Sequence, residues 1–218
     1  MKSICFRIFI ISLFLVGINT LVFADKNQPR EVQDHIDKGI AYGERGLLDE
    51  AILEFDAGLK ISPENAKLYV NRGLAYSLKG DFQKALADYS KAIQLNPSIA
   101  DFYNNRGFLY AKDLGLLGKG ISDFSKAIEI NPNFAKAYCN RGMAYHHQEK
   151  FDLALADFLK AIEIEPQNPN PYYNAAGVYL NKKDYMNAWS YYYKAKDLNA
   201  HMDPQFLEDL KKASGRNK

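Results

Sequence analysis

Four prolines recur along this chain at nearly constant spacing. Pro63, Pro97, Pro132 and Pro166 follow one another at intervals of about 34 residues. Near-copies of one phrase, Lys-Ala-Ile followed by a closing proline, lie at residues 91–97, 126–132 and 160–166. A period of about 20 to 50 residues is typical of arrays in which each repeat buries its apolar face against the next one. The spacing therefore predicts a stack of similar repeats.

Each repeat is predicted to contain two helices. Tyr69, Gly73 and Tyr76 lie at i, i+4 and i+7, which places them on one stripe of a helix with 3.6 residues per turn. The same spacing recurs after Gly80, which interrupts the pattern. The Asn-Pro pair at 96–97 ends the second helix, because proline disfavours a helical residue before it. Each repeat is thus expected to be a helix hairpin.

Small residues form one column in each helix of the repeat. The first column is Gly39, Gly73, Gly107, Gly142 and Ala176, and the second is Ala51, Ala85, Gly120, Ala154 and Ala188. Small side chains allow two helix axes to approach to about 8 Å. Two columns of large residues are expected to fill the space around each crossing: Tyr42, Tyr76, Tyr110, Tyr145 and Tyr179, and Phe55, Tyr89, Phe124, Phe158 and Tyr192.

A helical pair of about 34 residues with Gly, Tyr, Ala, aromatic and Pro at these positions resembles the tetratricopeptide repeat. The resemblance implies an all-α solenoid, a right-handed superhelix whose first helices line a concave groove for peptides or partner segments. The first repeat has His35 in place of the leading aromatic, and the fifth has Ala200 in place of the proline. The predicted segments are a linker (25–31), five repeats (32–65, 66–99, 100–134, 135–168, 169–202), a capping helix (203–213) and a tail (214–218).

The third repeat is one residue longer than its neighbours between the two large columns, from Tyr110 to Phe124. Gly115, Gly118 and Gly120 crowd the same stretch, and a glycine inside a helix costs about 0.8 to 1 kcal/mol relative to alanine. The sequence therefore predicts a longer, looser turn here and the weakest helix of the array. A neutral insertion on the convex side is the alternative.

The first 24 residues have the pattern of a secretory signal peptide. Lys2 and Arg7 precede an apolar run from Ile8 to Ile18, and Ala24 supplies the small residue for cleavage before Asp25. The alternative is an uncleaved anchor, since the apolar stretch is slightly shorter than the roughly 20 residues that span a bilayer. The protein is therefore expected to be exported to the periplasm or secreted, or else tethered by this segment.

The charge balance argues against polyanionic partners. The chain carries 28 Lys and Arg against 26 Asp and Glu, and removal of residues 1–24 with Lys2 and Arg7 would leave a formal charge of zero. A neutral chain lacks the basic surface that binds nucleic acid or anionic lipid, so neither is expected as a partner. Cys139 is the one cysteine after residue 24, which excludes an intramolecular disulfide in the cleaved chain.

An asparagine recurs two residues before the small residue of four first helices. At about 100° per residue it points about 200° away from the helix crossing, towards the exposed face. An amide can pair with both backbone groups of an extended peptide, and similar ladders line the groove in some tetratricopeptide proteins. The asparagines could instead be copied by duplication, or bond to neighbouring repeats. The predicted binding residues are Asn71, Asn105, Asn140, Asn174, Lys67, Phe108, Lys136, Met143 and Tyr173, with Leu74 and Asp101 beside them.

A clamp for a terminal carboxylate is not expected. The residues just before the four asparagines are Val70, Asn104, Cys139 and Tyr173, and none is basic. Charged columns also recur, with arginines at 72, 106 and 141 and aspartates at 88, 123 and 157. They are expected either to form ion pairs between repeats or to be solvated charges worth about 0 to 1 kcal/mol each.

No motif for nucleophilic catalysis or for phosphate or dinucleotide binding is present. His146 and His147 diverge by about 100° on a helix, so they are poorly placed to hold one metal ion with Glu149. We therefore expect no enzyme, metal or cofactor. The predicted function is a scaffold that binds a protein or peptide. The alternative is a structural subunit of an envelope or secretion assembly that uses convex or edge surfaces, and the oligomeric state is open.

Overall fold

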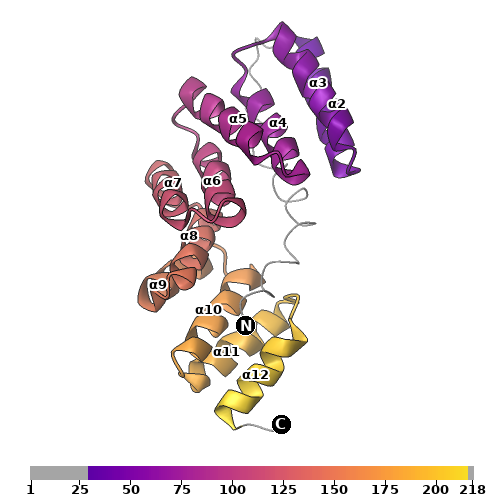
Figure 1. The fold of residues 1–218 in the computed structure, drawn as a ribbon. Coiled ribbons are helices and arrows are strands. Elements are labelled where there is room, and N and C mark those ends of the chain that lie inside the picture. Colours follow the sequence, from indigo (N-terminus) through magenta and orange to yellow (C-terminus); the bar gives the residue numbers. More distant parts are fainter. Residues whose placement is uncertain (1–28, 216–218) are drawn as a thin grey trace. The chain divides into compact units, whose positions relative to one another are not determined.

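The computed structural model describes residues 29–215, and these residues are helical hairpins with no strand (Figure 1). The all-α fold class predicted from the repeats is confirmed. The chain divides into two compact units, Met1–Leu109 and Tyr110–Lys218. Unit 1 contains α2 (Arg30–Glu44), α3 (Leu48–Ile61), α4 (Ala66–Lys79), α5 (Phe82–Leu95) and α6 (Ala100–Phe108). Unit 2 contains α7 (Leu117–Ile130), α8 (Ala135–His147), α9 (Phe151–Ile164), α10 (Pro169–Asn181), α11 (Tyr185–Asp197) and α12 (Pro204–Ser214).

Within each unit the helices pack in chain order. In unit 1, α2 packs on α3 and α4 on α5, and each pair packs on the next through α3–α4 and α5–α6. In unit 2 the same order holds for α8–α9 and α10–α11, joined through α7–α8 and α9–α10. This nearest-neighbour packing is the arrangement expected of a solenoid.

The first small column lies against the aromatic column of the second helices. A Cβ added at Gly39 would come within 2.3 Å of the Phe55 ring, and one at Gly142 within 2.8 Å of the Phe158 ring. At Gly73 the nearest atom, on the Tyr89 ring, would be 3.0 Å away. Glycine is therefore required at these positions because an aromatic ring occupies the space where a side chain would lie. Close approach to the small alanine of the second helix is the lesser reason.

The extra residue of the third repeat is taken up at the end of its first helix. In the other hairpins the turn is closed by a bond that spans five residues, as from the Asp81 N–H to the Tyr76 carbonyl at 2.9 Å. In the third, the Leu116 N–H donates to the Tyr110 carbonyl, six residues back, at 2.7 Å. Residues Leu109–Asp113 form a π-helical turn, which accommodates one residue more than an α-turn. The predicted longer turn is present, whereas the predicted weakness of α7 stays a prediction.

One residue of every hairpin turn has a positive φ angle. Gly46, Gly80 and Gly115 fill this position in the first three turns, with φ between 66° and 85°. Glu149 and Lys183 fill it in the fourth and fifth, with φ of 58° and 61°. A side chain in this region is strained. The turns of the last two hairpins are therefore under backbone strain that is absent from the first three, where the residue is glycine.

The capping helix α12 covers α11. Asp203 accepts a hydrogen bond from the Gln205 N–H at the helix start, and Leu210 is fully buried against Ala176 and Ala188. Phe206 stacks on Tyr192 with ring centroids 5.9 Å apart. The helix reaches Ser214, whose hydroxyl accepts from Trp189 Nε1 at 3.0 Å, so Ser214 belongs to the cap rather than to the predicted tail.

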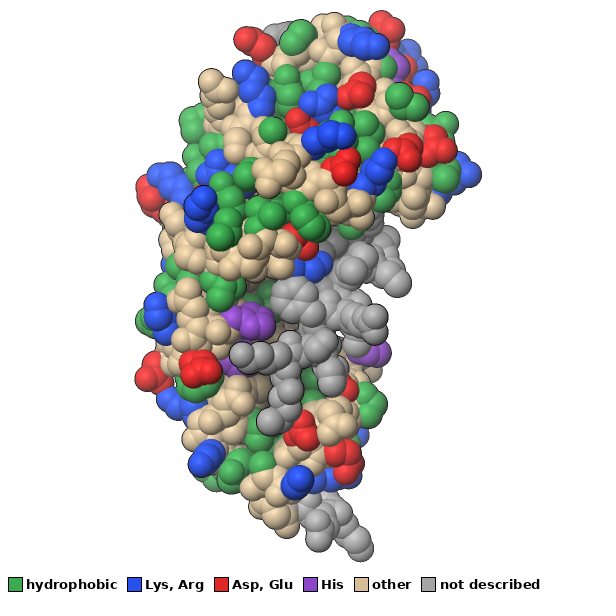
Figure 2. Space-filling model, viewed as in Figure 1, with side chains coloured by type: hydrophobic (Ala, Val, Ile, Leu, Met, Phe, Trp, Pro, Cys, Tyr) green, Lys and Arg blue, Asp and Glu red, His purple; other side chains and the backbone are tan. Residues whose placement is uncertain are grey.

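The predicted signal peptide, residues 1–24, lies outside the described residues. Within residues 29–215 no helix combines the length and apolar character needed to cross a membrane. Lys and Arg side chains are interspersed with Asp and Glu on the visible face (Figure 2), as the near-zero net charge implies.

Candidate functional site

Three of the four predicted asparagines have side-chain amides that bond to no other described residue. Asn71 on α4 and Asn105 on α6 belong to unit 1, and Asn174 on α10 belongs to unit 2; all three are half-buried. Their side chains make no hydrogen bond within the described part of the chain. Asn140 on α8 differs, because it is only 4% exposed. The expectation of an exposed ladder is therefore wrong at Asn140.

The side chains predicted to surround the asparagines are half-buried rather than open. In unit 1 these are Lys67, Leu74, Asp101 and Phe108, and in unit 2 they are Lys136, Met143 and Tyr173. Met143 packs against the core formed by α9 and α10. A binding role for these residues remains a proposal.

Tyr173 contacts the capping helix. Its ring lies 5.1 Å from the ring of Phe206, and its hydroxyl accepts a hydrogen bond from the Asp203 N–H at 3.4 Å. Because Tyr173 anchors α12, it is less available to a ligand than predicted. The sequence did not show this, since it does not reveal where a capping helix docks.

Each ladder asparagine in the second to fourth repeats is followed by an arginine, and two of these arginines, Arg72 and Arg141, each tie their helix to two others. In unit 1, Arg72 donates from Nε and Nη2 to both oxygens of Asp88, at 2.8 and 2.7 Å. Its Nη1 donates to Asp56 Oδ1 at 2.6 Å. Asp88 lies in the same hairpin and Asp56 in the preceding one. The predicted pairing of Arg72 with the aspartate column therefore lies within the repeat and not between repeats, and the link between repeats is made instead to Asp56, which was not predicted.

The same arrangement recurs at Arg141 in unit 2. Its Nε and Nη2 donate to Asp157 at 2.9 and 2.8 Å, and its Nη1 donates to Ser125 Oγ at 3.0 Å. In unit 1, Arg106 donates to Ser90 Oγ at 3.3 Å. Bidentate pairing fixes orientation as well as distance. Arg72 and Arg141 therefore fix the orientation of α4 and α8 relative to the second helices that they bond to.

The arginines are enclosed by tyrosines and carboxylates. The Arg72 guanidinium lies 5.4 Å from the Tyr69 ring centroid and 5.9 Å from that of Tyr76. Hydrogen bonding to Asp88 raises the pKa of Arg72, against the opposing effect of burial, and Asp56 adds to the rise. Hydrogen bonding to Asp157 likewise raises the pKa of Arg141. Both guanidinium groups therefore stay charged and cannot act as general acids.

The sequence reasoning overlooked the partners in the preceding repeat. Asp56, Ser90 and Ser125 precede the three arginines by one constant separation and recur with the period of the repeats. This column could have been found by aligning the second helices. The fifth repeat supports the pairing, because Ala175 replaces the arginine there and Leu159 replaces the polar partner.

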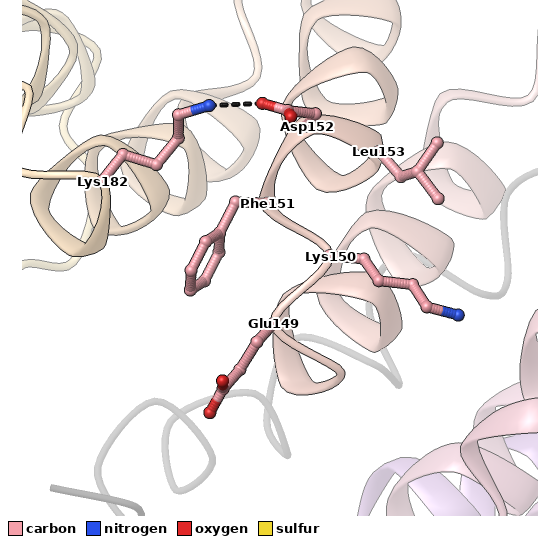
Figure 3. A pocket seen from close by; sticks show the side chains of 6 residues that line it. All are labelled: Glu149, Lys150, Phe151, Asp152, Leu153 and Lys182. Carbon is pink, nitrogen blue, oxygen red and sulfur yellow. Dashed lines mark hydrogen bonds and ion pairs between the residues drawn. The ribbon is translucent and has the colours of Figure 1, made fainter.

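An open hollow lies beside the fourth hairpin turn, and none of the ladder asparagines lines it. It has a volume of about 530 Å³ and is lined by Glu149, Lys150, Phe151, Asp152, Leu153 and Lys182 (Figure 3). Lys182, which directly follows α10, forms an ion pair with Asp152 on α9. Unit 1 has the same pair at the corresponding turn, between Lys79 and Asp49. The hollow is thus bordered by a recurring structural ion pair.

The histidines and the cysteine show no catalytic arrangement. His146 Nε2 lies 2.7 Å from Asn181 Nδ2, and burial, followed by the charge of His147, lowers the pKa of His146. Burial also raises the pKa of the Cys139 thiol to about 12, with Glu165 and Asp157 adding to the rise. A thiol with so high a pKa is a poor nucleophile. Within residues 29–215 no group of three His, Cys, Asp or Glu side chains is placed to hold a metal ion.

Sequence models of the tetratricopeptide repeat match residues 66–99 and 135–168, 100–134, and 158–190, and a further model of the same repeat class matches residues 39–80. Comparison with curated proteins finds no match.

Several solved structures are similar. MamA is 25% identical, with a TM-score of 0.65, over 74% of this chain and 94% of that chain. YrrB, described as a TPR protein with an unusual peptide-binding site, is 23% identical, with a TM-score of 0.63, over 84% and 93%. PilW, described as a type IV pilus biogenesis factor, is 20% identical, with a TM-score of 0.79, over 87% and 88%.

Proposed function

Since this chain belongs to the tetratricopeptide repeat family, we propose that it is a non-catalytic scaffold whose first helices bind an extended peptide or a segment of a partner protein. Members of this family are typically non-enzymatic scaffolds that bind proteins or peptides. The specific proposal is that Asn71 on α4 and Asn105 on α6, both in unit 1, contact the backbone of the bound segment, and that Asn174 on α10 makes the same kind of contact within unit 2. YrrB, with a similar fold, is described as having a peptide-binding site.

The proposal rests on three side-chain amides that lack a hydrogen-bond partner in the described part of the chain. Asn71, Asn105 and Asn174 are half-buried yet bond to no group in the described residues. If these asparagines stabilised neighbouring repeats, their amides would bond to groups of those repeats, and no such bond is present among the described residues. A carboxamide offers a donor and an acceptor, which match the two polar groups of a peptide unit. The pattern fits recognition that does not depend on the ligand's sequence.

The arginine pairs support this role by fixing the first helices. Asn71 and Asn105 each precede an arginine, Arg72 or Arg106, that bonds to the preceding second helix. A groove whose helices are held in place loses less conformational entropy when a segment binds. We infer that the arginines position the amides without contacting the ligand.

The test is peptide binding to asparagine variants. Peptides selected from a random display library against the wild-type protein are measured by fluorescence anisotropy against Asn71→Ala, Asn105→Ala and the double variant. Each lost hydrogen bond is worth about 1 kcal/mol, so each single variant should bind several-fold more weakly. The double variant should bind on the order of 30-fold more weakly.

Asn133→Ala is the matched control, because Asn133 is an exposed asparagine in a turn outside the ladder. Retention of full affinity by the double variant would exclude the amides as ligand contacts. Loss of affinity in the control as well would mean that the library peptides bind elsewhere.

We further propose that the protein is exported and acts in the cell envelope. Residues 1–24 have the pattern of a signal peptide, and PilW, which has a similar fold, is described as a pilus biogenesis factor. The mass and N-terminal sequence of the protein recovered from the envelope of its native cells test this. A chain that begins at Asp25 supports cleavage, whereas a full-length chain in the membrane fraction supports the tether.

A further inference from the structure

Gly177 interrupts a column of large apolar residues on the first helices. In the first four repeats, the residue directly after the small column is large, apolar and half-buried. These residues are Ile40, Leu74, Phe108 and Met143. The last three of them each follow a ladder asparagine by three residues. In the fifth repeat the position is Gly177, so α10 lacks the apolar side chain that each earlier first helix has.

Phe206 of the capping helix lies where a side chain at position 177 would extend. A Cβ added at Gly177 would be 3.9 Å from Phe206 Cε2, an ordinary contact distance. The Phe206 ring also lies 5.1 Å from the Tyr173 ring and stacks on the Tyr192 ring. Phe206 stays half-buried, as Met143 is at the equivalent position of the fourth repeat. An aromatic ring from α12 thus takes the place of the side chain that α10 lacks.

Other contacts along α12 hold this ring in place. The start of the helix bonds to the Tyr173 hydroxyl. In its middle, Leu210 is fully buried. At its end, Ser214 accepts a hydrogen bond from Trp189 Nε1 at 3.0 Å. Because α12 is held at three points besides Phe206, the ring has a fixed position on α10.

The Phe206 ring lies beside the unpaired amide of the fifth repeat. Asn174 directly follows Tyr173 and precedes Gly177 by three residues, and both of these neighbours contact the Phe206 ring. Residues three apart on a helix are neighbours on its surface. A segment whose backbone pairs with the Asn174 amide would therefore pass within reach of the exposed part of Phe206.

We propose that Phe206 is a ligand-binding residue of unit 2, and that the capping helix supplies the apolar contact that α10 lacks. This assignment rests on the proposed function, because it requires that Asn174 contacts a bound segment. It also defines the chemistry of that segment, which carries an apolar side chain next to the backbone group that pairs with Asn174. The capping helix is then part of the binding surface of unit 2 as well as the cover of its last repeat.

The test is peptide binding measured by fluorescence anisotropy. Peptides are selected from a random display library against the wild-type protein, and those that bind Asn174→Ala more weakly are kept. Phe206→Ala should weaken the binding of these peptides about tenfold, because an apolar contact at the centre of the site is lost. Leu207→Ala is the matched control, since Leu207 is a half-buried leucine of the same helix that packs on the same core. Its affinity should equal that of the wild type.

A variant that moves the apolar side chain from α12 to α10 gives the decisive result. Gly177→Leu restores the residue type that Leu74 supplies in the second repeat, so Gly177→Leu combined with Phe206→Ala should recover most of the lost affinity. Trp189 is the single tryptophan of the chain, and its emission reports whether α12 stays docked. Its emission should be the same in Phe206→Ala as in the wild type. A double variant that binds as weakly as Phe206→Ala overturns the proposal, and a shifted Trp189 emission would then show that Phe206 acts by holding α12.

Failure of the proposed function gives a different result. If no selected peptide binds Asn174→Ala more weakly than the wild type, the amide is not a ligand contact, and the proposed role of unit 2 falls together with that of Phe206. If peptides depend on Asn174 but bind Phe206→Ala as tightly as the wild type, only the role of Phe206 is overturned. Peptides that depend on Asn71 instead bind unit 1 and should be indifferent to Phe206→Ala.

Discussion

Arg72 and Asp88 are joined by two parallel hydrogen bonds that cross the hairpin of a single repeat. The Asp88 side chain is 7% exposed and that of Arg72 is 20% exposed, so the pair is largely shielded from water. Surface ion pairs contribute little because water competes with them. Here the burial makes the loss of one partner costly, since the other charge is left without its hydrogen bonds.

The first prediction concerns this pair. Asp88→Ala is expected to lower the free energy of unfolding of unit 1 by about 2 kcal/mol, the usual range for charged hydrogen bonds in partly buried sites. Asp81→Ala is the matched control, because Asp81 pairs with Lys84 at the surface and makes no capping bond. Its change should stay below about 0.5 kcal/mol. Urea unfolding measures both, and equal effects of the two variants would contradict the argument.

The hairpins and their packing could be predicted because they depend on side-chain volume and helix period. Gly39 and Gly73 occupy equivalent positions in successive repeats with aromatics in register, and steric exclusion at these positions leaves few alternatives. The family and the all-α fold follow from that pattern alone.

Other features depend on three-dimensional placement that spacing does not determine. From the sequence, the extra residue of the third repeat could lengthen either the turn or the first helix. In the structure it is accommodated where the two meet, by a π-helical turn at Leu109–Asp113. An arginine can reach the following or the preceding second helix, and Arg72 reaches both Asp88 and Asp56. At the site, periodicity placed the asparagines on one stripe but could not show that Asn140 is buried.

The second prediction concerns the glycine column. Gly142→Ala would place a Cβ 2.8 Å from the Phe158 ring and 3.2 Å from the Ala154 carbonyl, so it is expected to destabilise unit 2 by about 1 to 3 kcal/mol. Gly118→Ala, in α7, meets no atom within 4 Å and should stabilise by up to about 1 kcal/mol, because alanine is the better helix former. Thermal unfolding of both variants checks this, and a shift in the same direction would refute the steric explanation.

The third prediction concerns the strained turns. Glu149→Gly and Lys183→Gly are each expected to stabilise unit 2 by about 0.5 to 1 kcal/mol, because glycine adopts a positive φ without strain. Glu163→Gly, inside α9, should destabilise by about 1 kcal/mol, since φ is negative in a helix and glycine gains nothing there. Denaturant midpoints at one pH measure all three. If the turn variants lost stability as the helix variant does, the φ argument would be wrong.

The fourth prediction concerns pH. Burial lowers the pKa of His146 from its ordinary value of 6.5, so the folded state binds this proton less readily than the unfolded chain does. The unfolded state therefore carries more protons near pH 6, and the stability of unit 2 should fall as pH decreases through 6.5. His147 contributes to the lowering, while Asn181, which contacts the ring, does not titrate. His146→Gln should remove this component of the pH dependence, and His147→Gln should reduce it only slightly. Unfolding measured from pH 7.5 to 5.5 tests this, and a stability that rose on acidification would show that the folded protein favours the charged imidazole.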